Sequence, residues 1–239
     1  MEVNKIYNED CLLGLKKIPD NSIDLVLIDP PYDICTTGGK KGTGRLAKDM
    51  MKLEKELINN DLVNSFDIRI LDELIRVMKG INIYIWCNAR QIPMYIKYFN
   101  LELKCKLEIV IWGKTNPMPL YSNKYMNDKE YCLYFRNGGH CKPKNYEDAK
   151  SIYLSTINVK DKKLYEHPTI KPLKLIRKLV RNSSKENDIV LDCFLGSGTT
   201  AVACILENRK YIGFEINKKY FDIANKRISE INKDGDVNE

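Results

Sequence analysis

The sequence has few of the residues and patterns that mark metal proteins, secreted proteins or membrane proteins. It contains only 2 histidines, and its 8 cysteines are scattered singly, with no Cys-x-x-Cys pair. A zinc site needs about four clustered ligands, so we expect no metal site and reduced, buried thiols. No apolar run approaches the roughly 18–20 residues of a membrane span, and residues 1–10 lack the pattern of a signal peptide. These absences predict a soluble, cytoplasmic protein with no membrane partner.

The composition is that of an ordinary globular protein. Of the 239 residues, 44% are hydrophobic and 30% are charged, which argues against disordered and collagen-like classes. At about 100–200 residues per domain, we expect a single domain over residues 1–239. Lys and Arg (39) exceed Asp and Glu (32), for a net charge of +7. The excess favours an acidic partner such as nucleic acid only weakly, because a Lys- and Asn-rich chain can be basic through genome composition alone.

Short apolar runs alternate with amphipathic stretches along the chain. The runs predict buried strands at residues 23–28, 81–86, 107–112, 131–135, 189–191 and 211–214. Apolar residues at helical spacing predict helices within residues 68–78, 173–180, 201–206 and 220–231, the last after a cap at Asn217. Strands alternating with helices predict an α/β fold, in which a mostly parallel sheet is covered on both faces.

Two stretches depart from this alternation and are predicted as surface segments. Residues 36–45 are rich in Gly and Lys and contain no apolar residue, so we expect a basic loop within an insertion over residues 33–66. Residues 136–166 are polar and rich in Lys. Either stretch can be a solvated loop without a further role.

The tetrapeptide Asp29-Pro30-Pro31-Tyr32 directly follows the strand that ends at Ile28. Two prolines exclude both a helix and a continued central strand, so the chain must leave the sheet in a stiff, extended form. Ligands of open α/β sheets bind at this carboxyl edge. The tetrapeptide therefore presents a carboxylate, proline carbonyls and an aromatic ring where a substrate can reach them.

A second segment, residues 190–200, runs from a strand through a Gly-rich turn into a helix. Gly196 and Gly198 allow a tight turn and close approach of a ligand, and Thr199 is predicted to cap the helix. Glu215 ends the next strand, where an acidic side chain commonly binds the ribose hydroxyls of a nucleoside. A mononucleoside cofactor is favoured over a dinucleotide, because Thr200 or Ala201 replaces the third glycine of the dinucleotide pattern.

Together these segments resemble the S-adenosylmethionine-dependent DNA methyltransferases that act on exocyclic amino nitrogens. Asp29-Pro30-Pro31-Tyr32 is similar to their catalytic motif, and residues 194–198 (Phe-Leu-Gly-Ser-Gly) are similar to their cofactor motif. Residues 167–172 (His-Pro-Thr-Ile-Lys-Pro) match a third signature, and the order of the motifs is that of the beta class. Looser matches at Asp10-Cys11 and at residues 112–119, followed by Glu130, extend the resemblance to residues 6–231.

The resemblance implies a Rossmann-like class I methyltransferase fold with a seven-stranded sheet and a circularly permuted order of motifs. The strand before Asp10 then completes the cofactor half of the sheet, beside the C-terminal helix. The catalytic residues implied are Asp29, Pro30, Pro31 and Tyr32. The residues implied to surround S-adenosylmethionine are Asp10, Cys11, Asp29, Thr169, Lys171, Asp192, Phe194, Gly196, Ser197, Gly198, Thr199, Thr200, Glu215 and Ile216.

Within that set the resemblance implies particular roles. Glu215 binds the ribose, Asp10 binds the adenine amino group, and Phe194 lies beside the adenosyl moiety. Thr169 and Lys171 lie near the methionine carboxylate of the cofactor.

The implied substrate is double-stranded DNA, methylated at N6 of a flipped adenine. Asp at the first position of the tetrapeptide favours adenine over N4 of cytosine, and the resemblance leaves RNA methylation or an inactive DNA-binding protein as alternatives. Residues 136–166 lie where larger relatives carry a target-recognition region. The residues predicted to contact DNA are Lys40, Lys41, Arg45, Lys114, Asn116, Arg136, Lys142 and Lys144. A homodimer and a cognate restriction endonuclease are further partners that the resemblance implies.

Overall fold

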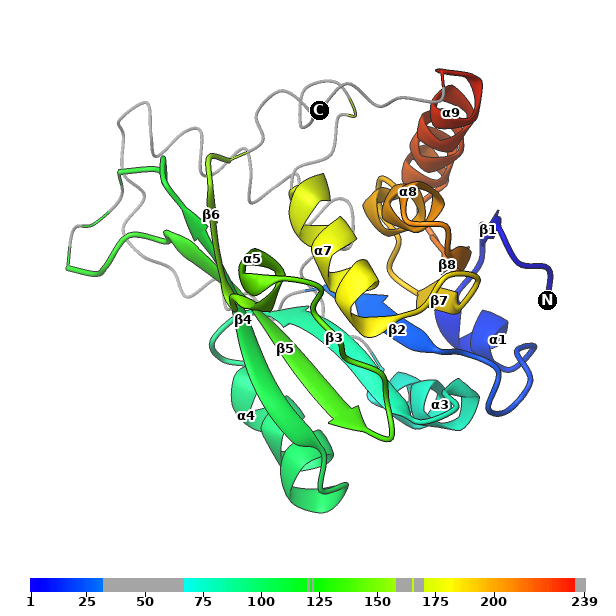
Figure 1. The fold of residues 1–239 in the computed structure, drawn as a ribbon, viewed down its shortest axis with the longest axis horizontal. Helices are drawn as coiled ribbons and strands as arrows, with labels where there is room; N and C mark the ends of the chain where they lie inside the picture. Colours follow the sequence, from blue (N-terminus) through cyan, green and yellow to red (C-terminus); the bar gives the residue numbers. More distant parts are fainter. Residues whose placement is uncertain (32–66, 120, 122, 158–164, 166–169, 235–239) are drawn as a thin grey trace.

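The computed structural model describes residues 1–31, 67–119, 121, 123–157, 165 and 170–234, which build one sheet covered by helices on both faces (Figure 1). The strands are β1 (Lys5–Tyr7), β2 (Leu25–Ile28), β3 (Ile81–Cys87), β4 (Lys106–Lys114), β5 (Lys129–Asn137), β6 (Ile152–Ser155), β7 (Ile189–Asp192) and β8 (Lys210–Phe214). Their order in the sheet is β1-β8-β7-β2-β3-β5-β4-β6. Within these eight strands, only β5 runs antiparallel to its two neighbours.

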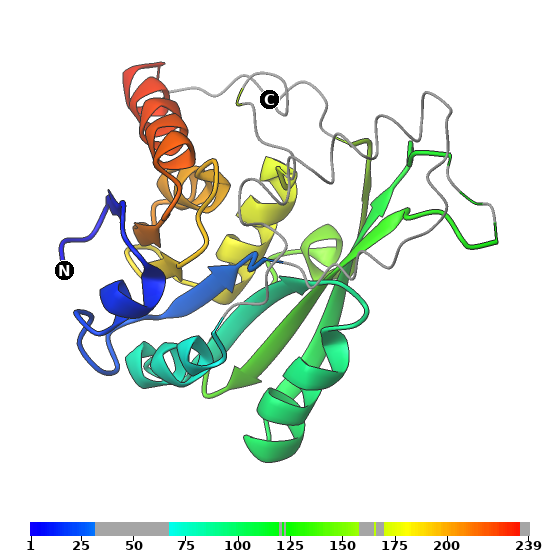
Figure 2. The same cartoon turned by 180° about the vertical axis from the view of Figure 1, so that it is seen from behind.

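Alternating side chains of the central strands form two apolar cores, one on each face of the sheet. Leu25 and Leu27 of β2 pack on one face, whereas Val26 and Ile28 pack on the other. The first face is covered by α7 (Leu173–Ser183), α8 (Thr199–Leu206) and α9 (Lys218–Asp234). The second is covered by α1 (Cys11–Leu15), α3 (Arg69–Val77), and α4 (Ile92–Tyr95) with the π-helical η1 (Ile96–Glu102), as the reverse view in Figure 2 shows.

The six strands and four helices predicted from the periodicity are all present, with ends shifted by a few residues. Asn217 caps α9 as predicted, because its side chain accepts hydrogen bonds from the backbone N–H groups of Lys219 and Tyr220. Seven cysteines lie in the described part of the chain; all are free thiols, and six are buried. The helices of this part include none that is both long enough and apolar enough to cross a membrane.

The predicted count of seven strands is wrong, because the sheet contains an eighth strand. β6 pairs in parallel with β4 at the edge of the sheet, within residues 136–166, which also hold the short helix α5 (Tyr146–Ala149). A strand of four residues at the edge of a sheet buries little apolar surface, and the side chains of Ile152 and Leu154 are exposed. The segment therefore lacks the apolar run by which the other strands are recognised. The predicted basic loop over residues 33–66 lies outside the described residues.

The circular permutation expected for the fold is confirmed by the pairing of β1. This strand runs parallel to β8, with Ile6 opposite Gly213, and so completes the half of the sheet that follows the Gly-rich turn. Ile6 belongs to the same apolar core as Ile228 and Ile231 of α9. The first strand thus lies beside the last helix, although more than 200 residues separate Ile6 from Ile228.

A topological switch between β7 and β2 creates the place where a ligand can bind. From β7 the chain proceeds through α8 to β8 on one side, and from β2 it proceeds through α3 to β3 on the other. The connections therefore diverge to opposite faces of the sheet, leaving a crevice beyond the carboxyl ends of β7 and β2. Asp192 ends β7, and Asp29 immediately follows β2.

Candidate active site

A pocket lies at this crevice and brings together most of the residues predicted from the sequence. The predicted residues that line it are Asp10, Cys11, Asp29, Pro31, Lys171, Asp192, Phe194, Gly196, Ser197, Thr199, Thr200, Glu215 and Ile216. Tyr32 and Thr169 lie outside the described residues. Pro30 and Gly198 are buried and are not among the described residues that line the pocket.

Glu215 fastens the Gly-rich turn that forms one wall of the pocket. One carboxylate oxygen accepts a hydrogen bond from the backbone N–H of Gly196 at 2.7 Å, and the other accepts from that of Asn217 at 2.8 Å. Burial raises the pKa of Glu215, and these two backbone donors oppose the rise. A single carboxylate therefore fixes both the turn and the start of the segment that leads to α9.

Gly198, rather than Thr199, occupies the N-cap position of α8, so the prediction that Thr199 caps this helix is wrong. Gly198 has a φ of 83°, a left-handed conformation that favours glycine, and a Cβ there would lie 3.0 Å from the Cβ of Ala224. Thr199 is the first helical residue, and its hydroxyl accepts a hydrogen bond from Arg227 at 2.9 Å. The glycine is thus explained by its backbone conformation and by the close packing of α9.

Asp192 lies at the end of β7 in the interior of the pocket. Burial raises its pKa to about 7, although a hydrogen bond from Thr200 and one from the backbone N–H of Phe194, at 3.0 Å, oppose this effect. The charges of Asp29 and Glu215 raise it further. Asp192 therefore gains and loses its proton near neutral pH.

Asp29, the first residue of the tetrapeptide, begins a chain of alternating charges at the wall of the pocket. Lys171 forms an ion pair with Asp29, and its Nζ lies 3.2 Å from a carboxylate oxygen of Glu130. Glu130 in turn lies 2.7 Å from the Nζ of Lys114. We call Asp29, Lys171, Glu130 and Lys114 the charge chain. Four separate parts of the sequence thus contribute to one network of charges, of which Asp29 and Lys171 line the pocket.

The charge chain is held in its ionised form by mutual attraction. Burial alone would raise the pKa of Glu130, but the charges of Lys171 and Lys114 outweigh it and lower that pKa to about 2. Burial would likewise lower the pKa of Lys171, but Asp29 and Glu130 outweigh it and raise that pKa. Both groups therefore stay charged throughout the neutral range of pH.

Two further side chains support this end of the site. Gln91 donates a hydrogen bond from Nε2 to the carbonyl oxygen of Pro31 at 3.3 Å, which ties the tetrapeptide to the loop after β3. Trp86 lines the pocket, and the Nζ of Lys171 lies 5.0 Å from the centre of its ring. The indole Nε1 of Trp86 is buried and has no hydrogen-bond partner among the described residues.

Sequence reasoning missed Gln91 and Trp86 and gave Glu130 no role. The position of Trp86 offered a signal, because it lies near the carboxyl end of a strand that neighbours β2. Glu130 is the second residue of the antiparallel strand β5, so its connection to Asp29 through Lys171 depends on the pairing of β3 with β5. The local pattern of apolar and polar residues does not predict which strands pair.

Comparison with known proteins agrees with this geometry. A family model described as DNA methylase, for the N6/N4 methyltransferases, matches residues 23–226. The chain belongs to the N6/N4 DNA methylase family. It is 34% identical over 255 residues to the type II methyltransferase M.HinfI of Haemophilus influenzae. The aligned region covers 96% of this chain and 69% of that protein.

Solved structures give the same fold for this methylase. The complex of M1.HpyAVI with S-adenosylmethionine (SAM) has a TM-score of 0.63 and 28% identity, covering 93% of this chain and 98% of that one. The cytosine-N4-specific PvuII DNA methyltransferase has a TM-score of 0.67 over 96% of this chain and 91% of its own, but only 18% identity, so it shows the fold alone. The protein is thus a SAM-dependent DNA methyltransferase with the class I fold.

The chemistry of the methylase pocket fits this cofactor. Phe194, Leu195 and Phe214 supply apolar surface for a purine ring, and Glu215 and Asp10 supply acceptors for hydroxyl and amino groups. The Nε1 of Trp86, which has no partner within the described part of the chain, is a buried donor for which a ligand can provide the acceptor. Acidic side chains around the pocket also suit a cofactor that carries a positive sulfur.

The structure separates the described residues that were predicted to contact DNA. Lys114 belongs to the charge chain, and the side chain of Asn116 accepts a hydrogen bond from the backbone N–H of Ile157 at 2.7 Å. Arg136, Lys142 and Lys144 lie at or beyond the end of β5, at the sheet edge opposite the pocket. Lys40, Lys41 and Arg45 lie outside the described residues. A role of all these residues in binding DNA stays a prediction.

Proposed function

We propose that this methylase transfers a methyl group to the exocyclic N6 of adenine at specific sites in DNA. The observation that supports adenine is Asp29, the first residue of the tetrapeptide, which lines the pocket at the carboxyl edge of the sheet. Family members with Asp at this position mostly methylate adenine, whereas those with Ser mostly methylate cytosine. A target amine is unreachable inside a duplex, so the adenine must rotate out of the helix before it enters the pocket.

The described residues account for how such an amine becomes reactive. Its lone pair is delocalised into the purine ring, which makes the nitrogen a poor nucleophile. In this proposal the carboxylate of Asp29 accepts a hydrogen bond from it, and so does the backbone carbonyl of Pro30, which lies between the pocket-lining Asp29 and Pro31. The two acceptors favour a pyramidal nitrogen with its lone pair directed at the methyl group. SAM, when bound, supplies that methyl group on a positively charged sulfur. The rate gain comes from orientation and from acceptors already placed where positive charge develops.

The charge chain fixes Asp29 for this role and limits an unfavourable effect of Lys171. The ammonium of Lys171 holds the Asp29 carboxylate in place, but its positive charge opposes the positive charge that develops on the target nitrogen. Glu130, 3.2 Å from Lys171, offsets this opposition. Lys114, 2.7 Å from Glu130, holds Glu130 from the other side. The chain therefore positions Asp29 while offsetting the positive charge of Lys171.

Nucleoside analysis of DNA treated with the purified protein and SAM tests the choice of base. We expect N6-methyladenine and no other modified nucleoside. Finding only N4-methylcytosine would refute the choice of adenine, and methylation of RNA without methylation of DNA would refute the substrate. Sequencing the genome of a methylation-free host that expresses the protein, by a method that detects modified bases, would then give the target site.

The resemblance to type II methyltransferases also supports two partners and a location. We infer a homodimer, which sedimentation of the purified protein tests directly. We further infer that a restriction endonuclease with the same target site accompanies the methylase, and that both act in the cytoplasm on chromosomal DNA. Cleavage of the host genome by a co-purified or co-encoded nuclease, blocked by prior methylation, would support this pairing.

A further inference from the structure

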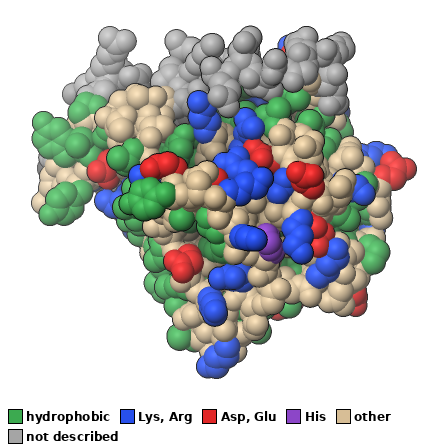
Figure 3. Space-filling view, viewed as in Figure 1, with side chains coloured by type: hydrophobic (Ala, Val, Ile, Leu, Met, Phe, Trp, Pro, Cys, Tyr) green, Lys and Arg blue, Asp and Glu red, His purple; other side chains and the backbone are tan. Residues whose placement is uncertain are grey.

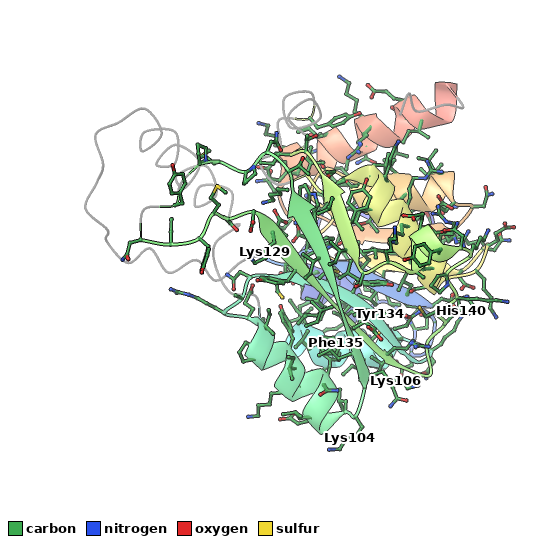
Figure 4. The ribbon with its side chains drawn as sticks, turned by 60° about the vertical axis from the view of Figure 1, so that its left-hand side comes forward. Lys104, Lys106, Lys129, Tyr134, Phe135 and His140 are labelled. Carbon is green, nitrogen blue, oxygen red and sulfur yellow. The ribbon has the colours of Figure 1, made fainter. Side chains whose placement is uncertain are left out.

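A second concave surface lies at the amino ends of the parallel strands, whereas the active-site pocket lies at their carboxyl ends. Its lining residues are His140, Lys142, Pro143, Lys144, Arg181, Ser184, Lys185, Glu186 and Arg209. Arg209 directly precedes β8, Lys185 precedes β7, and His140 follows the end of β5, where Asn137 pairs with the first residue of β3. Figure 4 labels Lys129, the first residue of β5, and His140, which lies just beyond the other end of this strand. We call this surface the basic groove.

Cationic side chains dominate the basic groove. Five Lys or Arg residues line it, against the single carboxylate of Glu186. Figure 3 shows this face, with Lys and Arg side chains gathered around the histidine. Lys142, Lys144 and Lys185 are exposed, and they form no ion pair with any residue that the structure describes. Their charges are therefore available to a partner.

Arg209 adds a positive charge that is buried beneath this surface. It is only 8% exposed, and its guanidinium donates to the hydroxyl of Ser184 at 3.0 Å, to the carbonyl of Ser184 at 2.7 Å, and to the carbonyl of Glu207. Within the described residues these partners are all neutral. Arg209 thus differs from Arg181, whose charge is offset by Asp148 and Glu207 at 2.8 and 3.0 Å.

The backbone that carries the lysines is fixed to the rest of the fold. The N–H of Lys142 donates to the carbonyl of Asn182 at the end of α7, at 2.7 Å. The hydroxyl of Tyr134 donates to the carbonyl of His140 at 3.1 Å. Burial lowers the pKa of His140, and the charges of Lys185, Lys142 and Arg136 act in the same direction against that of Asp188. The basic groove therefore has a positive potential, and its backbone is held in place by these hydrogen bonds.

We propose that the basic groove binds the phosphate backbone of a second segment of DNA, distinct from the segment whose base enters the active site. Exposed cations spread along an open concave surface suit a row of phosphates better than one enclosed anion. A second segment is required because the groove and the pocket lie at opposite edges of the sheet. The inference rests on DNA as the substrate and holds for adenine or cytosine alike.

A triple variant, Lys142→Gln with Lys144→Gln and Lys185→Gln, tests this proposal in the full chain. Binding to plasmid-length DNA should weaken about 10- to 100-fold, and the slope of log affinity against log salt should fall by about 3, because three phosphate contacts are lost. Binding and methylation of a short duplex with a single target site should stay unchanged. The short duplex thus reports on the proposed function, and the long DNA reports on the groove.

A control variant removes the same charge elsewhere. Lys16→Gln with Lys97→Gln and Lys226→Gln alters three exposed lysines that do not line the groove. It should leave the salt slope on long DNA unchanged, and equal melting temperatures would show that both variants fold. An equal loss in the two triple variants would overturn the proposal, because net charge alone would then explain the binding.

Three further outcomes would also overturn it. If the groove variant weakened binding of the short duplex as much as of the long DNA, the groove would belong to the surface that presents the target base. If long-DNA binding were unchanged while inorganic phosphate shifted the NMR signal of His140, the groove would be a site for a small anion. Unchanged binding in every assay would leave the groove without a ligand role.

Discussion

The surfaces at the carboxyl ends and at the amino ends of the parallel strands, here called the carboxyl edge and the amino edge, carry opposite charge. Each suits a different ligand. The pocket at the carboxyl edge is lined by five acidic side chains and one ammonium, namely Glu9, Asp10, Asp29, Asp192, Glu215 and Lys171. The basic groove at the amino edge is lined by five Lys or Arg residues and one carboxylate. A positively charged cofactor and a developing positive charge are favoured at the first edge, and phosphates at the second.

The comparison changes how the net charge of +7 is understood. Some of the excess Lys and Arg lies where the substrate base does not enter, and the catalytic edge is acidic. In the proposed reaction, DNA must therefore bring its phosphates close to acidic groups when a base enters the pocket. Any attraction that compensates for this must come from residues around or beyond the pocket. The following substitutions test whether the reaction depends on the acidic pocket independently of the basic groove.

Asp29→Ala should produce the largest effect, a loss of methyl transfer of about 10³-fold or more, because it removes a preformed acceptor at the reacting nitrogen. SAM binding, measured by calorimetry, should fall far less. The affinity of the Asp29→Ala variant for a short duplex should stay similar to that of the wild type, since no phosphate contact is lost. Full methylation activity in this variant would contradict the assignment of the catalytic carboxylate.

Sequence reasoning located the acidic edge much better than the basic one. Asp29, Gly196 and Glu215 lie within local patterns, because each follows or ends an apolar strand whose carboxyl end defines the site. Lys142, Lys185 and Arg209 come from three loops that only the pairing and order of β5, β7 and β8 bring together. Their positions thus depend on contacts between distant segments, which composition and periodicity do not encode.

The charge chain shows the same limit within the active site. Asp29 and Lys171 each lie in a recognisable motif, but their ion pair and its extension to Glu130 were not predicted. Lys171 was expected near the methionine carboxylate of the cofactor, and it lines the cofactor pocket while it pairs with two acidic side chains. A motif identifies which residues are needed, whereas their partners depend on the packed structure.

Glu130→Gln should have a smaller effect, lowering kcat about tenfold while leaving the KM for SAM nearly unchanged. The substitution keeps the shape of the side chain but removes the negative charge that offsets Lys171, so the charge near the target nitrogen becomes more positive. Steady-state kinetics with a short duplex would separate kcat from KM. A change confined to the KM for DNA would contradict the proposed effect on the chemical step.

The double variant Glu130→Gln with Lys114→Gln is the matched control for this charge effect. Removing both charges restores the balance of the charge chain, so kcat should recover part of the loss. Melting temperatures of the single and double variants are needed, because breaking one partner of a buried ion pair costs about 3–5 kcal/mol. A further fall in kcat in the double variant, with folding intact, would show that packing rather than charge carries the effect.

Asp192→Asn should have the smallest effect, a change in how stability depends on pH. Asp192 has a folded-state pKa of about 7, raised from the ordinary value of 3.8 by burial, so the folded wild type retains a proton that the unfolded chain releases. The contribution of this group to stability is full below about pH 4, and it declines as the pH rises toward 7. The Asn variant has no such group, and it keeps an oxygen that can accept from the N–H of Phe194. Urea unfolding at about pH 5 and about pH 8 should show wild type losing about 2 kcal/mol relative to the variant. Parallel pH dependences would mean that Asp192 is already ionised at pH 5, and the acidic edge would then keep its full charge across the neutral range.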